Sequence, residues 1–198
     1  MTSDSRLPFA VPPAIPPSTT SANPKVMQLA ELFEREPELI LACLESGSGD
    51  GSAVSSVVLS AAELAVARRP HYADLRYFAA HAAARGGKPG RAQDLLEQAL
   101  DLNPGYRDAQ ILAARVALAD GRFDQALAYV RQAVTDGADY PDVHLMLGDL
   151  CRQRGELLEA RRAYERALSL NANLDAARLG LAALGSSGQL GGSDELPA

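Results

Sequence analysis

The chain has 198 residues, of which 47% are hydrophobic and only 5% aromatic, and it contains no tryptophan. Alanine supplies much of the apolar content, which favours closely packed helices over a β-sandwich rich in Val, Ile and Tyr. The formal net charge of −6 argues against a general surface for nucleic acid or anionic membrane.

The cysteines and the apolar stretches indicate the compartment of the protein and whether it inserts into a membrane. Cys43 and Cys151 lie far apart, which argues against a disulfide framework and favours a reducing, cytoplasmic compartment. No run of about 18 apolar residues is present, so we expect no direct insertion into a membrane. The bias towards Ala, Arg, Leu and Gly is typical of bacterial proteins.

Residues 1–24 are rich in proline, with Ser and Thr in between. Because proline fixes φ and removes a backbone donor, we expect a disordered Pro-rich arm here. The stretch "VPPAIPP" could serve as a polyproline ligand, but a plain linker is the simpler interpretation.

Residues 25–52 are predicted to form an N-terminal helical segment and a Gly/Ser linker. Asn23 and Pro24 match an N-cap and a first helical residue. An apolar stripe with helical spacing follows, formed by Val26, Leu29, Ala30 and Phe33. The stretch "SGSGDGS" at 46–52 lacks the pattern of a phosphate or calcium loop, so we interpret it as the linker.

A 34-residue repeat organises the rest of the chain. Small residues recur at this spacing in three sets: Gly87, Gly121 and Gly155; Ala92, Ala126 and Ala160; and Ala99, Ala133 and Ala167. The glycines suit a sharp reversal with positive φ, and the alanines suit a seam where two helices approach closely. We predict first helices at 73–85, 107–120 and 141–154, and second helices at 90–102, 124–136 and 157–170.

The register of these small residues resembles the tetratricopeptide repeat (TPR) family. The small residue of its first helix is matched by Ala80, Ala114 and Gly148, and the large residue of its second helix by Leu96, Val130 and Tyr164. Pro104 matches the proline that ends a repeat. The resemblance implies an all-α, right-handed α-solenoid of antiparallel helix hairpins.

The resemblance also divides the chain. It implies a TPR domain at 53–184, with a degenerate half repeat at 53–72, repeats at 73–106, 107–140 and 141–174, and a capping helix at 175–184. The half repeat looks like a second helix whose partner is broken by residues 46–52. A disordered, Gly/Ser-rich tail is expected at 185–198. The family's early aromatic is replaced by Arg76, Gln110 and His144, which should weaken packing within each repeat.

In this family the first helices line a concave groove that commonly holds a peptide or a helix. Carried over to this chain, the partner-binding residues are Tyr77, Phe78, His81, Arg85, Ile111, Leu112, Arg115, Leu145, Met146, Asp149 and Arg152, with Asp74, Asp108 and Asp142 beside them. Tyr77, His81, Leu112 and Met146 fall where several residues of the family's carboxylate clamp would stand, so we expect no such clamp.

Two other interpretations of this apolar groove remain open. Its residues could pack between repeats as ordinary core, or the helix around Val26–Phe33 could fold back into it. That helix could also pair with a second copy of the chain, so homo-oligomerisation stays open.

We expect no enzyme, no cofactor and no metal site. His71, His81 and His144 are scattered, and none shares a helix face with a metal-like spacing of Cys or Glu. Cys151 should be a buried, inert side chain, and the charges around Glu159 should form a solvated helix face.

The resemblance implies a non-catalytic adaptor that scaffolds a larger complex by holding a partner protein segment in the groove. The alternatives are a secretion-type chaperone for apolar segments of translocator proteins and an auxiliary structural subunit of an enzyme or membrane complex. The sequence does not identify the partner protein.

Overall fold

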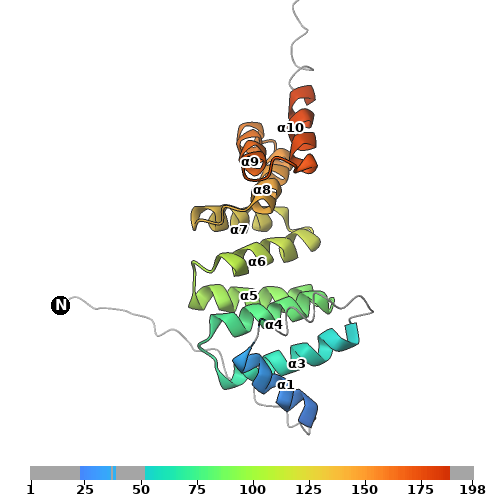
Figure 1. Ribbon diagram of the computed structural model, residues 1–198, viewed down its shortest axis with the longest axis vertical. Coiled ribbons are helices and arrows are strands. Elements are labelled where there is room, and N and C mark those ends of the chain that lie inside the picture. Colours follow the sequence, from blue (N-terminus) through green and yellow to red (C-terminus); the bar gives the residue numbers. More distant parts are fainter. Residues whose placement is uncertain (1–22, 37, 39–51, 188–198) are drawn as a thin grey trace, which may run out of the picture.

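The computed structural model describes residues 23–36, 38 and 52–187, and the regular secondary structure of these residues is entirely helical (Figure 1). The elements are α1 (Pro24–Arg35), α3 (Ser52–Arg68), α4 (Ala73–Arg85), α5 (Pro89–Leu102), α6 (Arg107–Ala119), α7 (Phe123–Thr135), α8 (Pro141–Arg154), α9 (Leu157–Leu170) and α10 (Asp175–Ser187). Most of the expected arm, linker and tail lies outside the described residues.

The helices stack as antiparallel hairpins along the long axis of the molecule, from α1 at one end to α10 at the other (Figure 1). Helices α4 and α5, α6 and α7, and α8 and α9 form the hairpins, and each hairpin packs on the next. This arrangement confirms the predicted all-α solenoid. The six predicted repeat helices begin and end within one residue of the observed bounds.

Three glycines reverse the chain inside the hairpins. Gly87, Gly121 and Gly155 have φ of 69°, 73° and 84°, a region that residues with a Cβ rarely adopt. The predicted reason for glycine at this register is therefore confirmed. Gly137, with φ of 92°, reverses the chain again between α7 and α8.

Helix α1 packs against α3 at the end of the stack. The Asn23 side chain caps α1 by accepting a hydrogen bond from the Lys25 amide at 3.1 Å, as predicted. Phe33 is buried, and Glu34 pairs with both Arg68 and Arg69, at 3.3 and 2.9 Å. The alternative in which this helix folds back along the predicted groove is therefore wrong, and α3 is not left without a helical partner.

The core is built from the repeated small residues. The alanines of the predicted seam, including Ala92, Ala126 and Ala160, have no exposed surface. The buried residues form two clusters that meet along α6, one reaching back to α1 and the other forward to α10. Tyr129 of α7 packs against both clusters, so the stack has a continuous apolar interior.

The polar residues at the family's early aromatic position make hydrogen bonds. The buried Gln110 amide donates to the Pro104 carbonyl at 2.7 Å and to Asp136 at 2.6 Å. Buried His144 lies 2.9 Å from Asp139. Gln110 and His144 thereby tie the start of α6 and of α8 to neighbouring turns, so hydrogen bonding takes over part of the role of aromatic packing there.

None of the described helices is both long enough and apolar enough to span a bilayer.

Candidate functional site

The predicted groove residues lie on α4, α6 and α8, and all but Arg85 and Arg152 recur at the same register in successive hairpins. We call their surface the first-helix face, formed by Asp74, Tyr77, His81, Arg85, Asp108, Ile111, Leu112, Arg115, Asp142, Leu145, Met146, Asp149 and Arg152. Phe78, which was also predicted to bind a partner, is buried with 7% of its surface exposed and belongs to the core.

The apolar residues of the first-helix face are half-buried. Tyr77 and Leu112 pack against the core cluster that reaches back to α1, whereas Ile111, Leu145 and Met146 pack against the one that reaches to α10. Packing between repeats therefore accounts for part of each side chain. The remaining part of each side chain is exposed.

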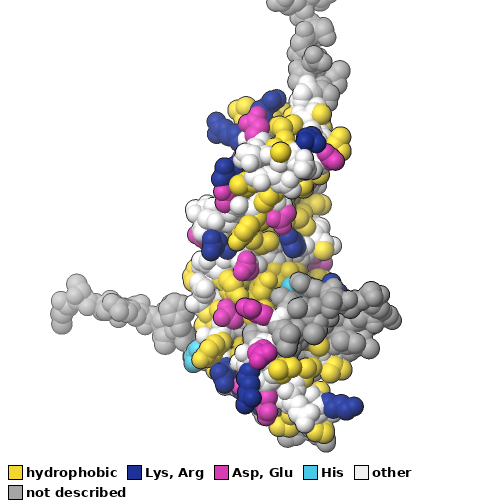
Figure 2. Space-filling model, in the orientation of Figure 1, with side chains coloured by type: hydrophobic (Ala, Val, Ile, Leu, Met, Phe, Trp, Pro, Cys, Tyr) yellow, Lys and Arg dark blue, Asp and Glu magenta, His cyan; other side chains and the backbone are white. Residues whose placement is uncertain are grey.

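Charged side chains surround this apolar strip. Arg115 of α6 reaches Asp142 of α8 at 2.6 Å, so the pair crosses from one first helix to the next. Over the visible side of the molecule, hydrophobic side chains alternate with charged ones along the stack instead of forming one large patch (Figure 2).

Two predicted partner-binding residues are already engaged by α9. The Tyr164 hydroxyl donates to Asp149 at 2.7 Å and accepts from Arg152 at 3.2 Å. Burial, together with the bond to Asp149, raises the pKa of Tyr164 to about 12, so the hydroxyl remains protonated at neutral pH. These contacts hold the two charged side chains in place before any partner arrives.

An aromatic cluster lies at the α4 end of the first-helix face. The Tyr77 ring centroid lies 5.2 Å from that of Phe78, 6.5 Å from His81 and 5.3 Å from Tyr106. Tyr106 is the N-cap residue of α6 and was missed by the sequence reasoning. The signal was available, because Tyr72, Tyr106 and Tyr140 recur at the 34-residue spacing.

The negative charge of Asp74 acts on the Tyr106 hydroxyl. Burial, followed by the negative charges of Asp74 and Asp108, holds the pKa of Tyr106 well above its usual range. The phenol therefore stays neutral, and it does not neutralise either carboxylate.

Leu179 of α10 was also missed, although it follows Leu145 by one repeat length. Its side chain is 71% exposed, and α10 packs on α8 and α9. One apolar side chain per first helix therefore recurs at Tyr77, Ile111 and Leu145, and the row continues at Leu179.

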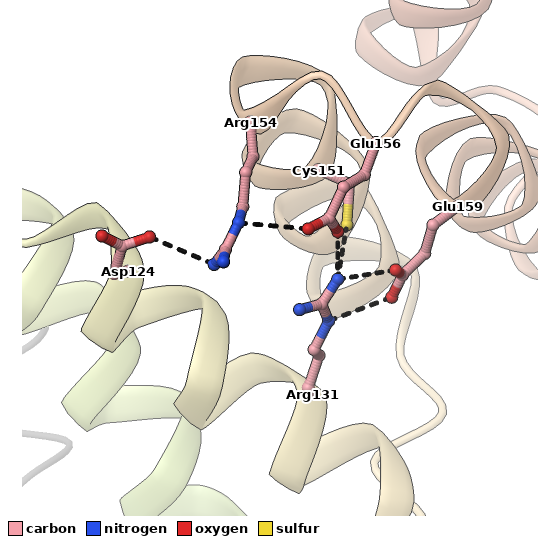
Figure 3. Close-up of polar contacts among 6 residues, drawn as sticks. All are labelled: Asp124, Arg131, Cys151, Arg154, Glu156 and Glu159. Carbon is pink, nitrogen blue, oxygen red and sulfur yellow. Dashed lines mark hydrogen bonds and ion pairs between the residues drawn. The ribbon is translucent and has the colours of Figure 1, made fainter.

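A second polar cluster joins α7 to the third hairpin (Figure 3). Arg131 pairs with Glu156 and with Glu159, the latter at 2.6 Å, and Arg154 bridges Glu156 to Asp124 at 3.1 Å each. Glu159 is therefore part of a contact between hairpins, and its side chain remains 42% exposed, which agrees with the predicted solvated face with modest pairing.

Cys151, Glu156 and Glu159 form a group of three potential metal ligands within 4.8 Å of one another in the described part of the chain. Arg131 already supplies the positive charge between the two carboxylates. Burial raises the pKa of the Cys151 thiol to about 11, which disfavours the thiolate that a soft metal requires. We interpret the group as an ion-pair cluster beside a buried thiol.

The described chain is similar to known repeat proteins. The tetratricopeptide repeat family models match residues 83–150 and 141–174. The chain has no match among curated protein sequences.

Solved structures share the fold. A MamA protein superimposes with a TM-score of 0.67 at 14% identity, over 84% of this chain and 82% of that one. YrrB, described as a TPR protein with an unusual peptide-binding site, gives 0.62 at 20%, over 67% and 68%. The first TPR of RPAP3, bound to the HSP90 peptide SRMEEVD, gives 0.55 at 21%, over 59% and 93%. At these identities the likeness concerns the fold alone.

Proposed function

Because the chain is a tetratricopeptide-repeat protein, we propose that it is a non-catalytic adaptor that holds a segment of another protein against the first-helix face. The observation that carries this proposal is the row of half-exposed apolar side chains at one register of successive hairpins: Tyr77, Ile111 and Leu145, continued at Leu179. A linear segment can contact such a row one side chain at a time.

The apolar contacts alone give weak binding. Full burial of a side chain of this size contributes roughly 1.5–3 kcal/mol, and these residues have already lost part of their exposed surface. Association costs roughly 4–15 kcal/mol in lost freedom. Useful affinity therefore requires polar contacts, which the carboxylates and arginines beside the row offer.

Peptide binding by structurally similar proteins supports the proposed kind of partner. The RPAP3 domain binds an HSP90 peptide, and YrrB has a peptide-binding site. The assembly role we propose is to scaffold a larger complex, and cysteine usage favours the cytoplasm as its place. A secretion-type chaperone or an auxiliary subunit of an enzyme or membrane complex would use the same apolar row.

The proposal is tested by placing negative charge at two positions of the row. Tyr77→Asp combined with Leu145→Asp should abolish the capture of partner proteins from a lysate of the source cells, because each carboxylate would be desolvated on binding. Quantitative mass spectrometry of the captured proteins provides the measurement. Circular dichroism and a thermal melt establish that the variant is folded.

The matched control is Leu158→Asp. Leu158 is 77% exposed on α9, outside the first-helix face, so this variant should capture the same proteins as the original chain. If the folded double variant also captures the same proteins, the first-helix face is not the binding surface.

A further inference from the structure

The first-helix face differs in charge along its length. Asp74, Asp108 and Asp142 occupy the same place in the first turns of α4, α6 and α8. Arg115 neutralises Asp142 at 2.6 Å. Among the described residues, neither Asp74 nor Asp108 forms an ion pair within 4 Å, so two carboxylates without such a pair lie at the α4–α6 end of the face.

These carboxylates have a structural role, because negative charge at a helix N-terminus is stabilised by the helix dipole. That stabilisation acts on all three aspartates alike. The helix dipole therefore does not explain why Asp142 pairs with Arg115 while Asp74 and Asp108 form no ion pair among the described residues. The difference places two carboxylates without an ion pair at one end of the face and a paired carboxylate towards the other.

The α4–α6 end also carries two aromatic rings. The centroids of Tyr77 and Tyr106 lie 5.3 Å apart, and Asp74 lies in the first turn of α4, the helix that carries Tyr77. A Lys or Arg side chain gains from contact with a ring face within about 6 Å of its centroid, and it gains more when a carboxylate is close. The remaining row, through Ile111 and Leu145 to Leu179, offers only apolar contacts at its centre.

We propose that the first-helix face binds a protein segment in one direction, with a Lys or Arg side chain at the Tyr77–Tyr106 end and apolar side chains towards Leu179. This inference rests on the proposed function and adds the chemistry and the orientation of the partner. Complementarity to Asp74 and Asp108 selects a basic partner end over an acidic one. A like-charged segment end would be repelled at the same place.

A random decapeptide library displayed on phage tests the inference on the full chain. Peptides selected by the original chain should be enriched in apolar residues and in Lys or Arg, grouped at one end. Asp74→Asn combined with Asp108→Asn should remove the Lys and Arg enrichment and keep the apolar enrichment. A selected peptide, synthesised with a fluorophore, should bind this variant about three- to tenfold more weakly at low salt, and the difference should shrink at 1 M NaCl.

The control with the same charge change is Asp94→Asn combined with Asp101→Asn, at two exposed positions of α5 outside the face. It should select the same peptides as the original chain. Selection of apolar peptides without excess Lys or Arg would overturn this inference and leave the proposed function standing. If Tyr77→Asp/Leu145→Asp selects the same peptides as the original chain, or the original chain selects none, the proposed function fails and the inference with it.

Discussion

The second and third hairpins close their helix–helix seams with different side chains. The second has Ala114 on its first helix and Val130 at the register of the large residue, whereas the third has Gly148 and Tyr164. A Cβ added to Gly148 would lie 2.6 Å from the Tyr164 ring, closer than van der Waals contact permits. The volume available at a seam is therefore shared, and a larger side chain on one helix requires a smaller one opposite.

Tyr164 also reaches beyond its own hairpin. A Cβ on Gly180 of α10 would lie 2.5 Å from the ring, so the tyrosine lies between two glycines on different helices. Its hydroxyl meets Asp149 and Arg152 on the first-helix face. Tyr164 thus contacts both α10 and the first-helix face. An aliphatic side chain such as Val130 has no hydroxyl and cannot make the hydrogen bonds to Asp149 and Arg152.

The largest expected effect comes from making the third seam resemble the first, which has Leu96 at this register. Tyr164→Leu should lower the free energy of unfolding by about 2–4 kcal/mol, because a cavity opens beside both glycines and Asp149 loses its hydroxyl partner. Urea denaturation followed by circular dichroism measures the change. Tyr164→Phe, which keeps the ring and removes only the hydroxyl, should cost clearly less.

Gly148→Ala sharpens the same comparison. Alone it should destabilise by about 1–3 kcal/mol, because the added methyl meets a ring held from the other side by α10. Combined with Tyr164→Leu, the new methyl partly fills the cavity, so the double variant should lose less than the sum of the two single losses. Additive losses would mean that the two positions do not share one space.

The comparison of these seams also shows which features of the structure could be predicted from the sequence. The helices and turn glycines were predictable because a 34-residue spacing repeats at Gly87, Gly121 and Gly155. The same spacing shows Leu179 and Tyr106, but one lies beyond the last full repeat and the other in a turn. The packing of α1 on α3, and the contacts of Tyr164 with Asp149 and Arg152, were not predictable. They depend on which side chains meet across helices, and a periodic pattern does not specify those pairs.

The second and third hairpins both reverse at a glycine with positive φ, and substitution of that glycine tests whether the two turns have the same requirement. Gly121→Ala and Gly155→Ala should each cost about 1–2 kcal/mol, because both residues have positive φ, and an added Cβ would meet no atom within 4 Å beyond the adjacent residues. The loss is conformational and should be nearly equal in the two hairpins, as measured by urea denaturation. A much larger loss at one turn would show that packing, and not backbone geometry, sets its requirement for glycine.

The contacts between neighbouring hairpins also differ. They can be compared at pairs of residues that lie 28 positions apart, one on α3, α5 or α7 and the other two helices further along the chain. Glu63 of α3 pairs with Arg91 of α5 at 2.7 Å, and Arg131 of α7 pairs with Glu159 of α9. Between α5 and α7, the corresponding residues are Glu97 and Gln125, and Gln93 donates to both Glu97 and Tyr129 at 2.9 Å. An ion pair therefore joins α3 to α5 and α7 to α9, whereas a hydrogen bond from Gln93 to Tyr129 joins α5 to α7.

The smallest expected effect is the loss of the ion pairs that Arg131 forms with Glu156 and Glu159. Arg131→Ala should reduce the free energy of unfolding by under about 1 kcal/mol, because the side chains of Arg131 and Glu159 are 37% and 42% exposed and water screens their attraction. Arg162→Ala, an exposed charge on α9, serves as the control for net charge and should change little.

The acid dependence of this effect identifies its cause. Hydrogen bonding from Arg131 holds the pKa of Glu159 below its usual value of 4.5. A carboxylate with a lowered pKa stabilises the folded chain fully above its unfolded-state pKa, and that stabilisation is lost as the pH falls through the folded-state value. The difference between Arg131→Ala and the original chain should therefore be present at pH 7 and shrink below about pH 4, when measured by urea midpoints. A difference that stays constant into acid would show that the effect does not depend on the ionisation of Glu159, and would point to other contacts of Arg131, such as that of its guanidinium with the Cys151 sulfur at 3.9 Å.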